Sequence, residues 1–516
     1  MDGEEGRRLS GLLDHWSRTR PEAEAIACEG RRLSYGELAA EVDLCAAALL
    51  AAGVRHGDRV AVLTTPREEF AVIFLALARI GGVWVGLNPR HRLAELSYVV
   101  ADTEPVLLFC LDRFEQRDYA PEAAALRAEH DSIRQLVSLG GPIDGAVPLA
   151  EFVARGGDEL SVGLDPAAPS SAGDPACVVY TSGSTGAPKG AVLTEAGLLT
   201  THRAMAERCG VKRPCLISDL PVDHVAGIGF LYTALASGGK LVLRERFDPA
   251  GSLATIAAER VDVWFAETTQ FLLALPRLGD HDLSSLRTIG YTTAPPLPVL
   301  ERLAALAERL ICGYGMTETS DLVLITEPGA ELDSLARGNV GLPIDGVEVR
   351  LAPSEAGEGD CGELQVRGEC TFAGYLNRPE ATAAARSGDG WLRTGDLMRA
   401  AGDGSFEFVG RAGEGFRSGG YNVAPAEVER VIEAHPGVAQ AAVIGVVDET
   451  FGATGHAFVI PRADAEPDAA ALRDHCRERL ANYKVPKAFT IAAELPLTRT
   501  EKIDKQALRA RLAPPG

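Results

Sequence analysis

A loop rich in glycine and hydroxyl side chains, closed by a lysine, is the clearest chemical feature of the sequence. Residues 178–190 read VVYTSGSTGAPKG, so an apolar run is followed by a loop that reaches Lys189. Glycines let backbone N–H groups turn inward, hydroxyls add donors and the ammonium adds charge, a combination that suits a polyphosphate. The alternative is a surface loop between two strands, and a P-loop is excluded because Gly190 follows the lysine. We expect nucleotide phosphates at Thr181, Ser182, Ser184, Thr185 and Lys189.

The charge balance makes local cations important for any such ligand. The chain has 51 Lys plus Arg against 72 Asp plus Glu, a formal charge of −21. The electrostatic field of this negative charge repels a phosphate backbone and argues against nucleic acid as a partner. Only seven of the basic residues are lysines, among them Lys189 and, near the C-terminus, Lys502. A compact ammonium approaches carboxylate and phosphate oxygens as a point charge, where a guanidinium is bulkier.

Five segments, in order along the chain, resemble the acyl-adenylate-forming (AMP-binding) superfamily, and within it the acyl-CoA and aryl-CoA synthetases. They are 178–190, 313–319 (GYGMTET), 390–396 (GWLRTGD), 410–411 (GR) with 419–427 (GGYNVAPAE), and 498–502 (TRTEK). The resemblance spans nearly the whole chain. It implies an AMP-forming carboxylate–CoA ligase that uses ATP, Mg²⁺ and coenzyme A, activates a small carboxylic acid as the acyl-adenylate, and transfers it to the CoA thiol.

The resemblance also assigns nucleotide-binding roles to residues whose chemistry suits them. Tyr314 would contact adenine, Thr317 the α-phosphate, and Glu318 a Mg²⁺ ion, for which a carboxylate is a natural ligand. Asp396 would accept the ribose hydroxyls, and Arg411 would pair with ribose or phosphate. The alternatives are ordinary structural roles: an N-cap threonine, an Asx turn and a surface salt bridge.

Lys502 would bridge the acyl carboxylate and the α-phosphate, and so completes the expected catalytic set with Thr317 and Glu318. By resemblance, the thioester step follows a rotation of a small C-terminal domain about a hinge at Gly413. A loop of that domain would then guide the CoA arm into the site. Its expected CoA-binding residues are Arg417, Gly419, Gly420 and Tyr421.

The acyl pocket is expected around His224, Gly227, Thr292 and Thr293. His224 resembles a gate beside the pocket, although a lone histidine before a Gly-rich apolar run is as readily a satisfied core residue. The apolar run 225–235 would line the pocket in either case. An aromatic content of 6% and the two threonines hint at a small or bulky cyclic acid rather than a fatty acyl chain.

Three positions depart from the family pattern. The hinge position is Gly413, the residue before Lys502 is Glu501, and Thr292 with Thr293 replace smaller residues. A glycine hinge specifies neither domain orientation strongly. These departures either tune specificity or weaken adenylation while sparing thioester formation.

The elements that must position these residues alternate between strand and helix. Apolar strand patterns at 59–64, 82–87 and 105–110 alternate with helical patterns at 69–80 and 91–101. The same alternation recurs between residues 241 and 289. This alternation predicts an α/β fold with doubly wound parallel sheets. Short Gly-bounded strands after residue 338 are typical of an antiparallel sheet or a barrel, and we expect a distorted β-barrel there. We expect a large N-terminal domain, 1–410, and a small mobile α+β domain, 411–516, that carries Lys502.

The sequence also allows other functions besides a carboxylate–CoA ligase. A stand-alone adenylating enzyme that loads a carrier-protein phosphopantetheine shares the thiol chemistry, as does a half-enzyme that forms thioesters from a supplied acyl-adenylate. A non-catalytic nucleotide-binding protein is the alternative from another class. Ten scattered cysteines without metal-site spacing, no signal-peptide pattern and no run long enough to span a bilayer predict a soluble cytoplasmic protein without membrane insertion.

Overall fold

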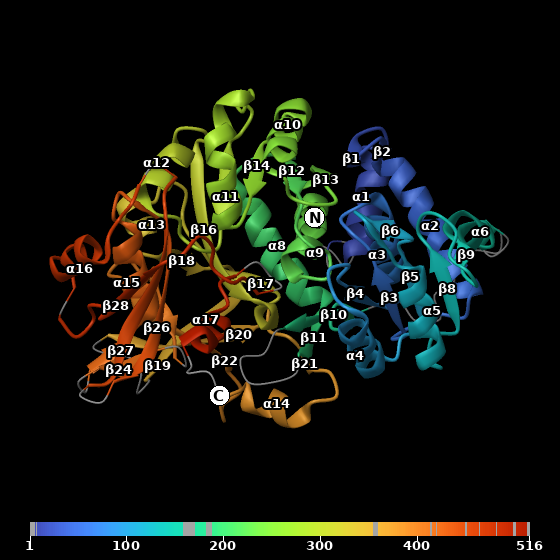
Figure 1. The fold of residues 1–516 in the computed structure, drawn as a ribbon. Helices are drawn as coiled ribbons and strands as arrows, with labels where there is room; N and C mark the ends of the chain where they lie inside the picture. The colour runs from blue at the N-terminus through green and yellow to red at the C-terminus, as the bar shows by residue number, and fades with distance from the viewer. Residues whose placement is uncertain are drawn as a thin grey trace.

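The computed structural model describes residues 6, 8–157, 171–181, 188–353, 360–412, 415–418, 421–448, 451–463, 465–480, 482–498 and 502–512. Two large β-sheets with helices between and around them are formed by the N-terminal and central parts of the chain, and a smaller sheet belongs to the C-terminal part (Figure 1). The α/β fold class predicted from the sequence is confirmed.

The largest sheet has 13 strands in the order β19-β20-β22-β23-β18-β17-β16-β15-β14-β12-β13-β1-β2. Its strands are β1 (Glu24–Cys28), β2 (Arg31–Ser34), β12 (Cys215–Ser218), β13 (Lys240–Leu243), β14 (Val263–Phe265), β15 (Thr288–Tyr291), β16 (Arg309–Met316), β17 (Asp321–Ile325), β18 (Asn339–Pro343), β19 (Val347–Pro353), β20 (Cys361–Gly368), β22 (Leu392–Ala400) and β23 (Phe406–Arg411). Pairing is parallel from β1 to β16 and antiparallel from β16 to β19.

The second sheet has eight strands in the order β21-β11-β10-β4-β3-β5-β8-β9. They are β3 (Arg59–Leu63), β4 (Val83–Leu87), β5 (Leu107–Cys110), β8 (Gln135–Ser138), β9 (Val147–Pro148), β10 (Pro175–Thr181), β11 (Lys189–Thr194) and β21 (Gly374–Tyr375). A separate short pair is formed by β6 (Arg113–Phe114) and β7 (Arg117–Asp118). The predicted strands at 59–64, 82–87 and 105–110 are β3, β4 and β5, and each is parallel to its neighbour as expected.

The prediction of a distorted β-barrel is wrong. The short strands after residue 338 do not close on themselves within the described chain, but extend the 13-stranded sheet. The reason lies in β16, which pairs in parallel with β15 along one edge and antiparallel with β17 along the other. The antiparallel strands therefore continue an existing sheet, so their backbone groups are paired without closure.

The helices cover the sheets and fill the space between them. They are α1 (Leu9–Thr19), α2 (Tyr35–Ala51), α3 (Glu68–Ile80), α4 (Leu93–Thr103), α5 (Ala120–Glu129), α6 (Leu149–Ala154), α8 (Glu195–Cys209), α9 (Val225–Ser237), α10 (Pro249–Glu259), α11 (Thr268–Ala274), α12 (Leu297–Ala304), α13 (Leu332–Ala336), α14 (Pro379–Ala384), α15 (Pro425–Glu433), α16 (Ala469–Arg477), α17 (Lys505–Leu512), and the 3₁₀ turns η2 (Leu275–Asp280) and η3 (Thr317–Thr319). Helix α8 contacts β11 of one sheet and β17 of the other, and it packs on α9 (Figure 1).

Helix α9 is formed by the longest uncharged apolar run of the chain. Ten of its residues are buried, in keeping with its place between other elements rather than at the surface. Across the described ranges, no helix is both long and apolar enough to cross a membrane.

The C-terminal part has a sheet and cores of its own. Its strands are β24 (Phe416–Ser418), β25 (Tyr421–Val423), β26 (Val438–Asp448), β27 (Gly452–Pro461) and β28 (Ala488–Ile491). Two apolar clusters lie between Val423 and Leu508, whereas the large core runs from Leu9 to Met398. The predicted boundary at 410/411 falls between these cores and stays a prediction.

A substitution at Gly341 tests how closely β18 packs against β17. Its φ is +88°, and a Cβ there would lie 2.1 Å from the backbone of Ile325 in β17. We expect Gly341→Ala to lower the free energy of unfolding by about 3 kcal/mol or more, because left-handed strain and overpacking add. Chemical denaturation measures it.

The matched control is Gly404→Ala. Gly404 has φ +89°, but its added Cβ meets only Leu342 at 3.7 Å. Its cost should be the conformational strain alone, about 1–2 kcal/mol. An equal loss in both variants would contradict the close approach at β18.

Candidate active site

Lys189 begins β11, the second strand of the hairpin whose loop was predicted to bind phosphates. Thr181 at the end of β10 pairs with Lys189, and its hydroxyl donates to the Lys189 carbonyl at 3.4 Å. The Tyr98 hydroxyl of α4 donates to the Pro188 carbonyl at 2.8 Å, which fixes the approach to the lysine. Three predicted phosphate ligands lie outside the described residues: Ser182, Ser184 and Thr185.

One tyrosine joins Lys189 to Glu318. The Lys189 ammonium lies 4.5 Å from the ring centre of Tyr375, and the Tyr375 hydroxyl donates to Glu318 Oε1 at 2.6 Å. Burial, and then the Glu318 carboxylate, raise the pKa of Tyr375, so its hydroxyl stays a donor. A cation over an aromatic face and a charge-assisted hydrogen bond are both favourable in a partly buried site. The structure thus brings an ammonium and a carboxylate together from two different sheets.

Asp396 in β22 is held by two donors. Its Oδ2 accepts from the Tyr314 hydroxyl at 2.6 Å and its Oδ1 from Arg411 Nε at 3.0 Å. Arg411 faces it across the β22–β23 pair, and the ring of Tyr314 packs against Phe408. Burial raises the pKa of Asp396, while Arg411 and Tyr314 oppose that shift. Each carboxylate oxygen has two lone pairs, so Asp396 can still accept hydrogen bonds from a ligand.

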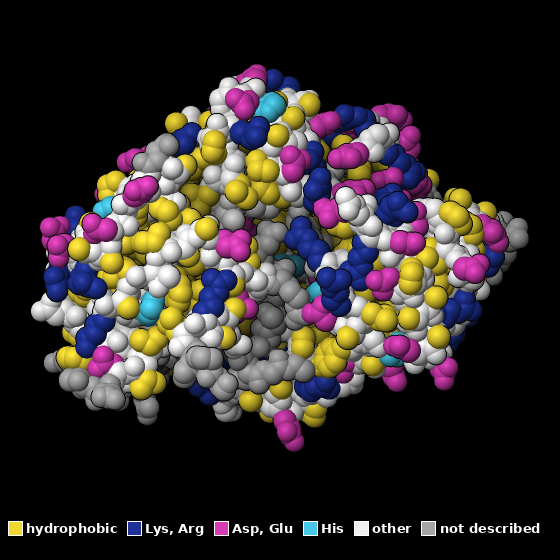
Figure 2. Space-filling view, in the orientation of Figure 1, with side chains coloured by type: hydrophobic (Ala, Val, Ile, Leu, Met, Phe, Trp, Pro, Cys, Tyr) yellow, Lys and Arg dark blue, Asp and Glu magenta, His cyan; other side chains and the backbone are white. Residues whose placement is uncertain are grey.

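Lys502 reaches toward this region from the C-terminal part. Its backbone N–H donates to Thr498 Oγ1 at 3.2 Å, and its side chain is exposed. Burial raises the pKa of Asp396, and the Lys502 charge is one of the groups that oppose this rise. Burial, and then the Lys502 charge, lower the pKa of His224 to about 4. Lys502 therefore interacts electrostatically with Asp396 of the predicted ribose site and with His224 of the predicted acyl pocket. Figure 2 shows Lys and Arg side chains along the rim of a hollow near the middle of this face.

His224 is the N-cap of α9. Its Nδ1 accepts from the backbone N–H of Ala226 at 3.3 Å, so Nε2 carries the proton of the neutral ring. Gly227 is explained by packing, because a Cβ there would lie 2.1 Å from the Pro221 carbonyl oxygen. His224 thus has a structural role that sequence reasoning did not separate from a gate.

The two pocket threonines follow β15 and are exposed. Thr292 donates to Glu267, with its hydroxyl 3.3 Å from both carboxylate oxygens. The Thr293 carbonyl accepts from the Thr268 hydroxyl at 2.5 Å. Both threonines therefore anchor the loop after β15 to the start of α11.

Only the two strands that flank the predicted CoA loop lie among the described residues. Arg417 and Tyr421 belong to the β24–β25 hairpin, and their side chains lie outside the described set. Gly413, Gly419, Gly420 and Glu501 also fall outside it, so the hinge, loop and departure predictions at these positions stay predictions.

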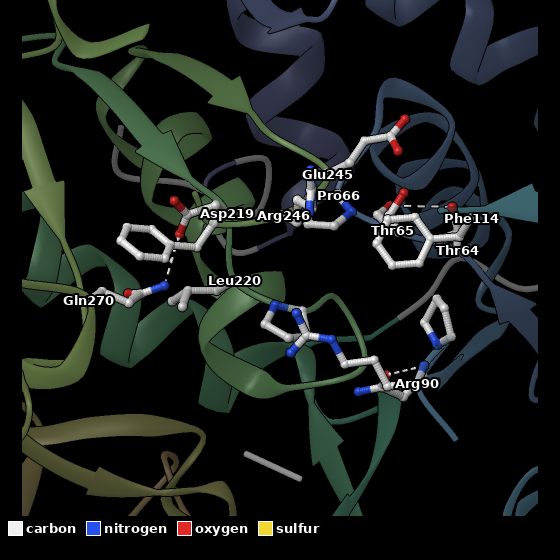
Figure 3. A pocket seen from close by; sticks show the side chains of 14 residues that line it. Thr64, Thr65, Pro66, Arg90, Phe114, Asp219, Leu220, Glu245, Arg246 and Gln270 are labelled. Atoms are coloured by element: carbon white, nitrogen blue, oxygen red, sulfur yellow. Dashed lines mark hydrogen bonds between the residues drawn. The ribbon is translucent and has the colours of Figure 1, made fainter. Parts of the chain in front are cut away.

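A second polar pocket lies where carboxyl ends of parallel strands from both large sheets meet, as ligand sites of open α/β sheets do (Figure 3). Segments after β3, β4, β12 and β13 line it, with Arg90, Arg246 and Phe114 among the side chains. Asp219 accepts from Ser252 at 3.0 Å and from Gln270 at 3.3 Å, and burial raises its pKa to about 6. Sequence reasoning missed this pocket, because its residues come from many short segments.

Comparison with known proteins gives a family for most of the chain. The model of the AMP-binding enzyme family matches residues 13–376, and that of the AMP-binding enzyme C-terminal domain matches residues 427–502. The chain belongs to the AMP-binding enzyme family. The predicted superfamily is therefore confirmed.

Curated relatives in this AMP-binding family are acid–CoA ligases. The chain is 36% identical to a feruloyl-CoA synthase from Amycolatopsis sp., over 96% of this chain and 97% of the relative. It is 32% identical to an indoleacetate–CoA ligase from Aromatoleum aromaticum, over 98% of each. A crystal structure of the anthranilate CoA ligase AuaEII in complex with anthranoyl-AMP has a TM-score of 0.87 at 25% identity, covering 98% of this chain and 97% of that one. The predicted class, an AMP-forming acid–CoA ligase that uses ATP, is confirmed.

Tyr375 is the residue that sequence reasoning missed and that the geometry emphasises. It sits in a two-residue strand, and no spacing in the sequence connects it with Glu318 or Lys189. Its register opposite Ala191 in β11 brings it to both. Only the pairing of β21 with β11 could have revealed it.

Tyr375→Phe removes the hydroxyl and keeps the ring under Lys189. A hydrogen bond to a charged group contributes about 1.5–3 kcal/mol, so we expect ATP–pyrophosphate exchange to slow by about 10- to 100-fold. Tyr35→Phe is the matched control, because the Tyr35 hydroxyl is also buried and donates to Gly239 at 2.6 Å, outside this site. Equal exchange rates in wild type and Tyr375→Phe would contradict a role for the contact in catalysis.

Proposed function

We propose that the chain activates a ring-bearing carboxylic acid with MgATP and passes the acyl group to the thiol of coenzyme A at the site around Lys189, Glu318, Asp396 and Lys502. The observation that carries this proposal is electrostatic. Cations from two parts of the chain converge on buried carboxylates in a protein of net charge −21. Such a concentration of charge suits a polyphosphate with its metal ion.

The nucleotide would lie between the Lys189 hairpin and the Tyr314–Asp396 pair. Asp396 is held rigidly by two donors and would accept the ribose hydroxyls, with Arg411 beside it. Within the described chain, no cluster of three or more His, Cys, Asp or Glu side chains is arranged to hold a metal alone. One carboxylate, Glu318, still fits Mg²⁺, which commonly uses one or two carboxylates together with substrate phosphates.

The reaction would proceed in two displacements. A carboxylate oxygen attacks the α-phosphorus of ATP and pyrophosphate leaves, so that a mixed anhydride forms. The CoA thiolate then attacks the acyl carbon and AMP leaves with the electron pair of the broken C–O bond. Lys189 and Lys502 would stabilise the negative charge that develops on the α-phosphate in the first step.

The acid is proposed to carry a ring because of the relatives. Those reported above are named for ferulate, indoleacetate and anthranilate, all ring-bearing acids. The loop of Thr292 and Thr293, braced on Glu267 and Thr268, would give the acyl pocket a fixed wall. A fixed wall favours a shaped acid over a flexible chain.

The second polar pocket favours CoA over a carrier protein as acceptor. Arg90 and Arg246 can neutralise phosphates, and the Phe114 ring can stack on a purine. The pocket also contains Pro221, three residues before His224, so a pantetheine arm leaving it would pass toward the acyl pocket. A carrier protein presents the same arm without the nucleotide and would leave this pocket unused.

The cysteines support a reducing compartment, which we propose to be the cytoplasm. All ten are free thiols, and seven of them are buried. Burial raises the pKa of several, such as Cys45 to about 12, so they are inert in the folded protein. Secreted proteins of oxidising compartments usually pair such residues.

Lys502→Ala separates the two half-reactions. We expect acyl-adenylate formation to fall by at least about 100-fold, since one donor aimed at developing charge contributes about 3–4 kcal/mol. Thioester formation from a supplied acyl-adenylate should change little, because Lys502 lies on the C-terminal part that is expected to turn away for that step. Pyrophosphate release and thioester are measured separately over an acid panel, with exposed Lys212→Ala as control.

The same assay tests the alternatives. Equal damage to both half-reactions would contradict the two-orientation mechanism. Wild-type protein that forms thioester only from supplied acyl-adenylate would be a half-enzyme, as Glu501 and Gly413 allow. Faster transfer to a carrier protein than to CoA would overturn the proposed acceptor.

Asp396→Asn keeps the shape of the side chain and removes its charge. We expect ATP affinity to fall by about 10- to 100-fold, because charge-assisted hydrogen bonds of about 1.5–3 kcal/mol become neutral ones. Isothermal titration with a non-hydrolysable ATP analogue measures it. Unchanged affinity would remove the ribose role from Asp396.

A further inference from the structure

Helix α15 of the C-terminal part packs on strand β23 of the large sheet. A Cβ placed on Gly410 of β23 would lie 3.7 Å from the Ala424 Cβ and 4.0 Å from the Ala426 Cβ, so small residues on both sides allow a close approach. The predicted hinge, Gly413, lies between β23 and α15 in the sequence. The contact therefore joins the two parts of the chain that are expected to move relative to each other.

The Arg430 side chain of α15 reaches across this contact to the backbone of β23. Its Nη2 donates to the Phe408 carbonyl at 3.4 Å, and its Nε donates to the Ala426 carbonyl of its own helix at 3.2 Å. Burial lowers the pKa of Arg430, so the guanidinium is largely shielded from water in this orientation. A hydrogen bond from a charged donor favours the orientation that makes it, and a long one is weak enough to be broken in each catalytic cycle.

Gly338 gives the guanidinium room on the large sheet. Its φ is +94°, and a Cβ there would lie 3.0 Å from Arg430 Nη1 and 3.2 Å from the Phe408 carbonyl oxygen. The Gly338 carbonyl accepts from the Phe408 N–H at 2.9 Å, which fixes the acceptor strand beside the glycine. A glycine and a strand carbonyl of the large sheet thus form the surface that Arg430 contacts.

Helix α15 is also tied to the segment that carries Lys502. Glu429, next to Arg430 in the helix, pairs with Lys505 at 2.8 Å, and their side chains are 15% and 17% exposed. An ion pair that is mostly buried is little screened by salt. Lys505 begins α17, shortly after Lys502. A contact that holds α15 on β23 therefore also holds the Lys502 segment in its present place.

We infer that Arg430 is a positioning residue for adenylation, because its contact with Phe408 holds the C-terminal part in the orientation that presents Lys502. The inference rests on the proposed function and deepens it. Arg430 acts through Lys502, by setting how often the lysine is in place. Loss of the contact shifts the balance toward the orientation in which Lys502 is withdrawn, and the rates of the two half-reactions follow the two populations.

Arg430→Met keeps the apolar stem and removes the guanidinium. The measured quantity is the rate of acyl-adenylate formation divided by the rate of thioester formation from a supplied acyl-adenylate. We expect this ratio to fall by about tenfold, because one hydrogen bond from a charged donor is lost in one orientation only. A merely structural role would lower both rates equally and leave the ratio at its wild-type value, which would overturn the inference.

Arg462→Met is the matched control for the lost guanidinium. Arg462 is also a half-buried arginine of the C-terminal part, and its Nε donates to the Val438 carbonyl at 3.0 Å within that same part. Its bond is unaffected by the orientation of the C-terminal part, so the ratio should stay at the wild-type value. A fall as large as that in Arg430→Met would overturn the inference.

Gly338→Ala tests the same contact without altering the C-terminal part, and it decides the matter if Arg430→Met does not fold. The added Cβ would push Arg430 Nη1 away from β23, so the ratio should fall here too. Gly346→Ala is the control, because Gly346 has φ +79° but its added Cβ meets nothing within 4 Å. In the Arg430→Met background Gly338→Ala should lower the ratio no further, since the two changes remove one contact.

The outcomes separate this inference from the proposed function. A wild-type protein that completes both half-reactions, with an unchanged ratio in Arg430→Met and Gly338→Ala, would overturn the inference alone. Equal ratios in Gly338→Ala and Gly346→Ala, or full additivity in the double variant, would do the same. A wild-type protein that activates no acid would overturn the proposed function and the inference together.

Discussion

A buried carboxylate that must be neutralised from two directions organises the centre of this protein. Asp396 is 2% exposed, and a charge at that depth is costly unless it is paired and hydrogen-bonded. Tyr314 on β16 and Arg411 at the end of β23 supply the donors, although β16 and β23 are separated in the sheet by β17 and β18. The antiparallel half of the large sheet is thereby tied to its parallel half, and Arg411 stands where the chain leaves for the C-terminal part.

A similar tie joins the two large sheets to each other. Tyr375 belongs to the eight-stranded sheet, while Glu318 belongs to the turn between two strands of the larger sheet. The Phe372 N–H donates to the Glu318 carbonyl at 2.9 Å, so backbone and side chain of Glu318 are both held by the 372–375 segment. The Lys189 ammonium lies over the face of the Tyr375 ring. These contacts help to align the two sheets at the site.

Much of the fold and the motif positions could be predicted from the sequence, because periodicity and Gly-rich turns are local signals. Strands β3, β4 and β5 and helix α3 are local in this sense, and so is the loop that ends at Lys189. The barrel prediction failed because strand pattern does not tell which edge a strand joins. Tyr375 could not be found for a related reason: its partners Lys189 and Glu318 lie far away in sequence, and only the pairing of β21 with β11 brings the three residues together.

The pairing of Arg411 with Asp396 has a consequence for the order of events. Arg411 is the last residue of β23 and belongs to the large sheet, whereas Lys502 belongs to the C-terminal part. A movement that begins beyond Arg411 would withdraw Lys502 while the tyrosine, the carboxylate and the guanidinium keep their places. The acyl-adenylate would then stay bound through its AMP part, and only its acyl carbon would become accessible to the CoA thiol. Such retention would protect a mixed anhydride from loss to bulk water between the two steps.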